Sequence, residues 1–287
     1  MAIDPQRLLD HRFADIGHSY VARDAILYAL GLGLGADPLD EKDLPYLLED
    51  RLKVLPTMAV TLASPGLWVK EPALGINWVK LVHSAQEAEF FAPLPVKADV
   101  VGSARIASLH DRGAERGAVV VVERNIKDAA SGQLYCTLRQ TLLLRGDGGF
   151  GGEPPVEDKS GTPPARAPDF QIAIPTSRRA ALIYRLSGDW NPLHADPVVA
   201  LAAGFERPIL HGLASYGVAG LAVCRALGVD TDQLRSLALR FANVVFPGDV
   251  LDFSIWRDGT SVTFEARVAD KIVLSKGQAK IGGLHDR

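Results

Sequence analysis

The chain has 287 residues, of which 47% are hydrophobic and 23% charged, a globular composition long enough to bury a sizeable core. Its formal charge of −3 offers no general attraction to nucleic acid or to an anionic membrane, and neither is expected as a partner. The two cysteines, Cys136 and Cys224, have no CxxC or Cys/His spacing, so they indicate neither a disulfide framework nor a metal site.

The first residues, MAIDPQRLLDHRF, lack the basic and then apolar pattern of a signal peptide. No uninterrupted run of about 18 apolar residues, the length that spans a bilayer as a helix, occurs in the chain. We therefore expect a soluble protein of the cytoplasm.

The first half of the chain carries helical material and then strand-like segments. The strands are predicted at residues 100–111, 117–128 and 133–146. Residues 146–168 are dense in Gly, Pro and charge, which is typical of a linker. The predicted division is therefore a first domain over 1–145, a linker over 146–168 and a second domain over 169–287.

The second half repeats this order. Residues 212–228 are apolar on nearly every face, with Arg225 as the only charge, and they close on a Gly suited to a helix end. This predicts a buried helix. Four strands with short turns are predicted after it, which implies an antiparallel sheet, at residues 236–246, 249–258, 260–270 and 271–281.

A single apolar helix followed by an antiparallel sheet predicts the hot-dog arrangement, in which the sheet wraps the helix because neither can bury its apolar surface alone. The order of elements in the two halves indicates an internal duplication. Its offset relates Pro56 to Pro208 and Pro95 to Pro247. The predicted fold class is α+β, a double hot-dog of two repeats, each a sheet around a central helix.

One segment of the second half, SGDWNPLHAD, places Asp189 and His194 close together in a loop that suits neither helix nor strand. A carboxylate and an imidazole can bind one water and take its proton. At the duplication offset His194 corresponds to Lys42, so the first half lacks this chemistry. Taken singly, such loop residues are more often merely solvated, and Asn191 could orient the water or cap the loop.

A second segment, GFERPILHGLASYG, delivers Gly212 to the start of the buried helix. The first N–H groups of a helix have no intrahelical partner and carry the positive end of its dipole. A thioester oxygen placed there would be polarised, as in an oxyanion hole, and Gly leaves room for its approach. The neighbouring His211 is expected to fix the turn by a hydrogen bond rather than to take part in the chemistry.

The segment YRLSGDWNPLHADPVVALAAGFERPILHGL resembles the signature of the MaoC-like family, most closely its 2-enoyl-CoA hydratase 2 group. RDAILYALGLG, LPTMAV and LLRGDGGFGG in the first half resemble the N-terminal repeat of the same proteins. At residues 83–86 the chain has HSAQ where that repeat tends to have His-Gly-Glu-Gln. The side of the site that faces the acyl chain is therefore expected to differ.

The resemblance implies reversible hydration of trans-2-enoyl-CoA to (3R)-3-hydroxyacyl-CoA, a hydro-lyase activity without a cofactor. It implies that Asp189 and His194 activate the water, that Asn191 assists and that the Gly212 N–H holds the thioester oxygen. It also implies a first repeat that has lost the catalytic loop and gives room to a long or bulky acyl chain.

Five further residues are candidates for contacts with the acyl-CoA substrate. Guanidinium groups suit coenzyme A phosphates and aromatic rings suit a tunnel wall, although ion pairing and core packing are equally open for them. The candidates are Tyr184, Trp190, Arg207, Tyr216 and Arg240.

Two alternatives to a hydratase keep the same fold. Hot-dog proteins include thioesterases, against which the Asp-x-Asn-Pro-x-His loop speaks. A non-catalytic acyl-CoA binding subunit is the other alternative, and the presence of Asp189, His194 and Gly212 together argues against it. Because hot-dog sheets often pair edge to edge, a homodimer is a further expectation.

Overall fold

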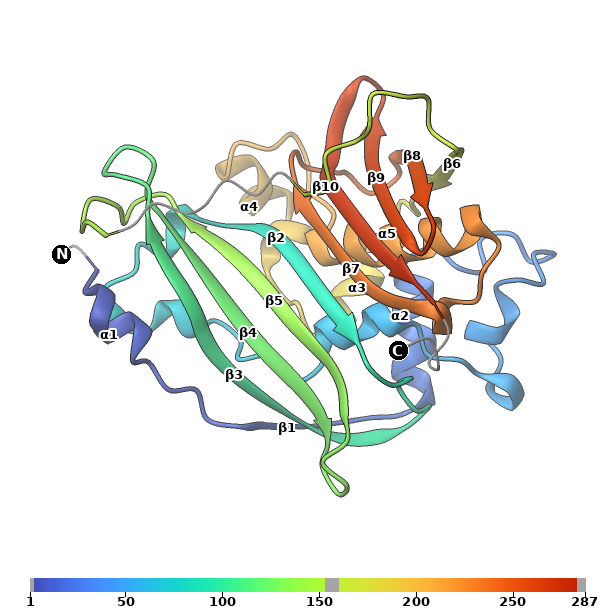
Figure 1. Ribbon diagram of the computed structural model, residues 1–287, viewed down its shortest axis with the longest axis horizontal. Coiled ribbons are helices and arrows are strands. Elements are labelled where there is room, and N and C mark those ends of the chain that lie inside the picture. The colour runs from blue at the N-terminus through green and yellow to red at the C-terminus, as the bar shows by residue number, and fades with distance from the viewer. Residues whose placement is uncertain (1–2, 153–159, 283–287) are drawn as a thin grey trace.

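A computed structural model describes residues 3–152 and 160–282 and shows one curved antiparallel sheet with helices on one side (Figure 1). The first half of the chain contributes five neighbouring strands, in the order β1, β3, β4, β5, β2 across the sheet. Their bounds are β1 (Ile16–Tyr20), β2 (Leu81–Phe90), β3 (Ala98–Asp111), β4 (Ala118–Asp128) and β5 (Leu134–Leu144).

The second half continues the sheet with five more strands, in the order β7, β10, β9, β8, β6. This is the same order as in the first half, read from the centre of the sheet outward. Their bounds are β6 (Phe170–Pro175), β7 (Leu234–Phe241), β8 (Val250–Asp258), β9 (Ser261–Val268) and β10 (Lys271–Ile281).

The two halves join where β2 pairs with β7, with Ala85 opposite Arg240 and Glu89 opposite Ser236. Each repeat thus covers the open edge of the other, which removes two exposed edges from the centre of the sheet. The repeated strand order confirms the predicted double hot-dog of α+β class. The proposed linker 146–168 lies only partly within the described residues, since 153–159 fall outside them.

Helix α5 (Gly212–Leu227) fills the concave side of the second repeat. Its residues 214–224 are all buried, because small side chains such as Ala219 and Gly220 let the strands approach closely. Gly228 ends the helix in the left-handed conformation, with φ of 64°. The other α-helices are short: α1 (Pro5–Leu9), α2 (Ala22–Gly31), α3 (Ala180–Tyr184) and α4 (Pro197–Ala202).

The prediction of a central α-helix in the first repeat is wrong. Only a 3-10 helix, η3 (Pro56–Thr61), lies in the corresponding place, and further short turns follow it. Pro65 and Pro72 follow at close spacing, and a proline inside a helix removes a hydrogen bond and clashes with the preceding turn. The segment therefore cannot continue as an α-helix.

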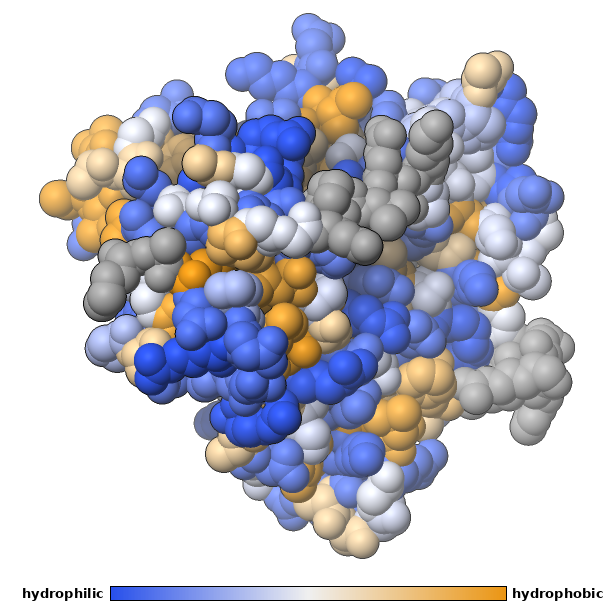
Figure 2. All heavy atoms as spheres, turned by 60° about the vertical axis from the view of Figure 1, so that its left-hand side comes forward, coloured by the Kyte–Doolittle hydropathy of each residue, from blue (hydrophilic) through white to orange (hydrophobic). Residues whose placement is uncertain are grey.

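The strand predicted over 236–246 ends earlier, at Phe241. The chain leaves the sheet because the Val245 carbonyl accepts a hydrogen bond from the Leu210 N–H, at 2.7 Å, and so holds the turn that leads into α5. On the face shown in Figure 2, polar residues surround several separate apolar patches. Among the described residues, no helix has the length and hydrophobicity needed to cross a membrane.

Candidate active site

The loop between α3 and α4 carries Asp189 and His194, and local hydrogen bonds shape it. Gly188, at φ of 112°, makes the turn that ends the preceding helical segment, a conformation that favours glycine. The Asn191 side chain accepts a hydrogen bond from the Leu193 N–H at 3.1 Å and so caps the single turn η8 (Pro192–His194). Asn191 therefore braces the loop, one of the two roles the sequence left open for it.

His194 is oriented for proton transfer by a backbone contact. Its Nδ1 lies 2.9 Å from the Ile209 carbonyl oxygen, and a carbonyl only accepts, so Nδ1 donates. In the neutral ring Nε2 then carries the lone pair. Burial lowers the pKa of His194, although the Ile209 contact opposes this, so the ring is neutral at pH 7. The structure therefore leaves one basic nitrogen free.

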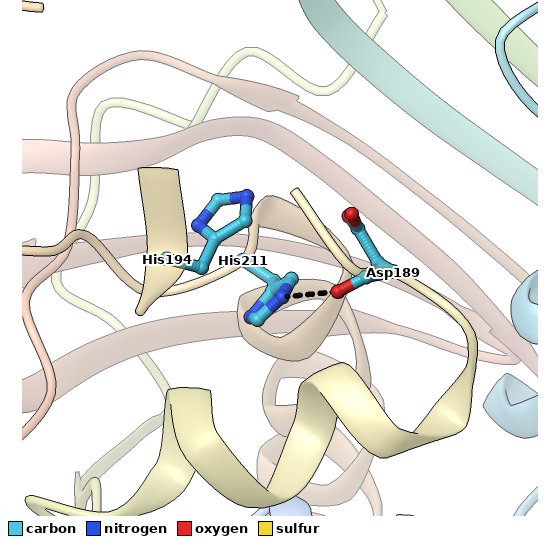
Figure 3. A group of neighbouring side chains, drawn as sticks. All are labelled: Asp189, His194 and His211. Carbon is cyan, nitrogen blue, oxygen red and sulfur yellow. Dashed lines mark hydrogen bonds between the residues drawn. The ribbon is translucent and has the colours of Figure 1, made fainter. Parts of the chain in front are cut away.

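His211 stacks on His194, with ring centroids 3.8 Å apart and planes at 26°. Its Nε2 donates to the Asp189 backbone carbonyl at 3.2 Å, which ties the loop between α3 and α4 to the start of α5 (Figure 3). Burial, and then the neighbouring His194, lower the pKa of His211 to about 4. The prediction that His211 fixes the turn is confirmed.

The N-terminus of α5 lies at the same place, because His211 is its N-cap. The first bonds of the helix run from Ala214 and Ser215 to the His211 carbonyl. Within the described parts of the chain, the Gly212 N–H has no acceptor. A Cβ on Gly212 would meet only the Phe241 ring, at 3.4 Å, so the protein's own packing does not require glycine here.

Asp189, His194 and His211 form one cluster, in which one ligand atom from each lies within 4.8 Å of the others. Two hydrogen bonds of about 2.8 Å to a single water span such a gap. The two imidazole planes are nearly parallel and each ring already uses one nitrogen on a backbone carbonyl, so their lone pairs do not converge on one ion. The geometry suits a water better than a metal.

The first repeat contributes a histidine that the sequence reasoning did not assign to the site. His83 on β2 packs edge-on against Phe241, with centroids 5.1 Å apart. It donates to the Ala85 carbonyl through Nε2 and accepts from Gln140 through Nδ1. Burial lowers its pKa to about 4, although the Asp189 carboxylate opposes this. The available sequence signal was the comparison of residues 83–86 with the family pattern, in which the first residue is also His.

The structure does not bring two of the five predicted substrate contacts together with Gly212. Tyr216 is fully buried in the core, where its hydroxyl donates to the Leu237 carbonyl at 2.9 Å. Arg240 lies on the outer face of the sheet, because side chains alternate along a strand and the adjacent Leu239 and Phe241 both face inward. Tyr216 therefore contacts the core, and Arg240 lies on the opposite face of β7 from Phe241.

Tyr184 is also buried, and its ring lies 5.0 Å from that of His211. It supports His211 from beneath instead of lining an open tunnel. Trp190 is 56% exposed and packs over Arg185, at the edge of the loop. Arg207 and Arg178 line an open pocket of about 690 Å³, in which Arg207 lies 3.7 Å from Asp249. Trp190 and Arg207 remain accessible to a ligand.

Two family descriptions match the chain, one for each repeat. The MaoC-like domain matches residues 159–277. The hydratase 2 N-terminal domain of the multifunctional enzyme MFE-2 matches residues 18–146. The boundary between the two matches falls in the proposed linker.

Curated relatives and solved structures are similar over nearly the whole chain. Enoyl-CoA hydratase ChsH3 of Mycobacterium tuberculosis is 38% identical, over 90% of this chain and 91% of its own. The peroxisomal enoyl-CoA hydratase 2 of Arabidopsis thaliana is 36% identical, over 96% and 95%. The solved MaoC-like dehydratase of Phytophthora capsici has a TM-score of 0.84 at 29% identity, over 96% and 98%.

Proposed function

Since this chain belongs to the MaoC-like dehydratase family and also carries the hydratase 2 N-terminal domain, we propose that it hydrates trans-2-enoyl-CoA reversibly to (3R)-3-hydroxyacyl-CoA. One observation carries the proposal. A carboxylate oxygen of Asp189 and a ring nitrogen of His194 lie within 4.8 Å of each other, close enough to share one water. His211 of the same cluster directly precedes Gly212, whose N–H has no acceptor among the described residues.

Asp189 and His194, on the loop between α3 and α4, activate the water. Asp189 and His194 hold the water, and the lone pair on His194 Nε2 accepts its proton as the oxygen attacks C3 of the enoyl group. His211 holds the Asp189 backbone in place and so acts as a positioning residue. One of the two side chains of the pair then returns a proton to C2. The sum is one water added across the double bond, and no cofactor enters.

The thioester oxygen is the point where negative charge develops during the addition, because attack at C3 pushes electrons into an enolate. The Gly212 N–H donates to this oxygen, and the dipole of α5 adds to the stabilisation. An amide that is already fixed by a buried helix needs no reorganisation during the reaction. Loss of one such donor typically costs about 10²-fold in kcat.

The coenzyme A part of the bound substrate would extend from the site along the residues that precede α5. Arg207 stands five residues before Gly212, and with Arg178 it lines the open pocket beside Gly248. Guanidinium groups bind phosphates through paired hydrogen bonds. We assign this pocket to the coenzyme A phosphates, with Arg207 exchanging its long contact to Asp249 for the ligand.

Turnover of crotonyl-CoA and of a longer enoyl-CoA by the purified chain tests the proposal. Hydration removes the absorbance of the conjugated thioester without releasing free thiol, and the product has the 3R configuration. Release of thiol would instead identify a thioesterase. Absence of any reaction with both substrates, together with tight binding, would identify a non-catalytic acyl-CoA binding protein.

A further inference from the structure

The first repeat contains a cavity where the second repeat has its central helix. The cavity is small and partly open to solvent. Its walls include Val60 of η3 and three polar side chains from the sheet, which are Gln86, Arg124 and Gln140. Ligand pockets are lined mostly by apolar groups, and the few polar groups among them select the ligand. The lining therefore indicates a ligand with a polar part.

Arg124 on β4 is the feature that sets this cavity apart. Its Nη2 donates to the Val60 carbonyl at 2.8 Å, while its buried Nε has no acceptor among the residues described. No carboxylate within the described chain lies at ion-pair distance from it. Arg105 and Arg139, in contrast, both pair with Glu123 on the outer face of the same sheet.

The Arg124 side chain is half-buried, so its guanidinium loses part of its hydration at the buried Nε, and no anion replaces what is lost. Burial lowers the pKa of Arg124 to about 10, so the group stays charged at neutral pH. In the free protein, water in the cavity can hydrate it. An alkyl chain would displace that water without providing a hydrogen-bond acceptor. A carboxylate would accept paired hydrogen bonds from the guanidinium group of Arg124.

The cavity adjoins the catalytic site. Leu213, which lines it, directly follows Gly212 on α5. Gln140, which also lines it, donates to His83, the histidine that packs on Phe241 next to Gly212. An acyl chain with its thioester oxygen on the Gly212 amide therefore has this cavity as its nearest internal space.

From the cavity, the half-buried Arg124 that has no ion pair among the described residues, and the place of the cavity beside Gly212, we propose that the preferred substrates are enoyl thioesters whose acyl chain ends in a carboxylate, and that Arg124 binds this carboxylate. The inference rests on the proposed hydratase function and names its substrate class. Arg124 is a specificity-determining residue, since it touches the distal end of the chain and not the reacting carbons.

The test compares trans-2-enoyl-CoA substrates of equal length, six and eight carbons, that end in either a methyl group or a carboxylate. We expect kcat/KM of the unaltered protein to be about 10-fold or more higher for the carboxylate-ended member of at least one pair, as for a charge-assisted hydrogen bond. Arg124→Met should abolish this advantage and leave turnover of the methyl-ended substrates intact. Arg105→Met, on the outer face, is the matched control and should retain the preference.

If kcat/KM of the unaltered protein for each methyl-ended substrate equals or exceeds that for the carboxylate-ended substrate of the same length, the inference is overturned while the hydratase function stands. An equal loss on both substrate types in a folded Arg124→Met protein would also overturn it. If neither type is hydrated, calorimetry with saturated acyl-CoA pairs decides: tighter binding of the carboxylate-ended member supports the cavity assignment, and equal binding rejects it. Should Arg124→Met fail to fold, the comparison on the unaltered protein still decides.

Discussion

The two repeats share a strand order but differ in what fills their concave sides. In the second repeat, residues 212–227 form a continuous helix whose free N–H groups meet the loop with Asp189 and His194. In the first, prolines limit the corresponding chain to η3, and the Val60 carbonyl faces Arg124. A helix start that offers donors suits an oxyanion, whereas the lost helix leaves a cavity with a cation. In the function that we propose, the two repeats thus supply the two ends of one substrate site.

The largest expected effect is the loss of turnover when the loop residues of the second repeat are replaced. Asp189→Asn and His194→Gln should each lower kcat by about 10²-fold or more, since each removes an acid/base group. The control is Lys42→Gln, because Lys42 is the residue of the first repeat that corresponds to His194 at the duplication offset. This variant should keep full activity. The measurements are kcat on crotonyl-CoA and a thermal melt. Near-normal turnover in both site variants would remove this pair from the mechanism.

A smaller effect is expected from Gly212→Ala. Its Cβ would meet only Phe241 at an ordinary distance of 3.4 Å, so the melting temperature should hardly change. The added methyl group would lie where a substrate oxygen approaches the amide, and we expect kcat/KM to fall about 10-fold. Unchanged kcat/KM in this variant would show that the thioester binds elsewhere.

Much of this contrast could be predicted from the sequence, and the reasons are local. The polar loop and the helix start that follows it occupy one short stretch, 187–217, so their proximity needs little long-range information. The strand alternation and the apolar run of α5 likewise carry their own signals. The double hot-dog and the neighbouring Asp189, His194 and Gly212 followed from these.

What could not be predicted depends on pairing between distant segments. The junction of β2 with β7 brings His83 to Phe241, and nothing local to either strand encodes it. Arg240 was misplaced because its face of the strand depends on register, and Tyr216 because the buried side of α5 depends on what surrounds it. Arg124 gave no signal in the sequence, since burial without a counter-ion is visible only in three dimensions.

The contact between the repeats can be tested by stability alone. A Cβ on Gly217 of α5 would lie 2.6 Å from the Tyr28 hydroxyl oxygen and 2.7 Å from Leu32, both from the first repeat. Gly217→Ala should therefore lower the free energy of unfolding by about 1–3 kcal/mol through overpacking. Gly212→Ala is the control at the other end of the helix contact. Denaturant unfolding measures both, and equal stability of the two variants would contradict the packing described.

The last comparison concerns acid stability, because each repeat contributes a histidine whose pKa is lowered by burial. Burial is the main cause that lowers the pKa of both His83 and His211 to about 4, below the ordinary value of 6.5. Between these values the unfolded chain binds more protons, so the free energy of unfolding should fall as pH drops from 6.5 to 4, by on the order of 1 kcal/mol per pH unit for each group. His83→Gln should reduce this slope in denaturant titrations. An unaltered slope in the His83 variant would mean that His83 carries its proton in the folded protein between pH 4 and 6.5. A protonated ring donates from both nitrogens, so it could not accept the hydrogen bond from Gln140.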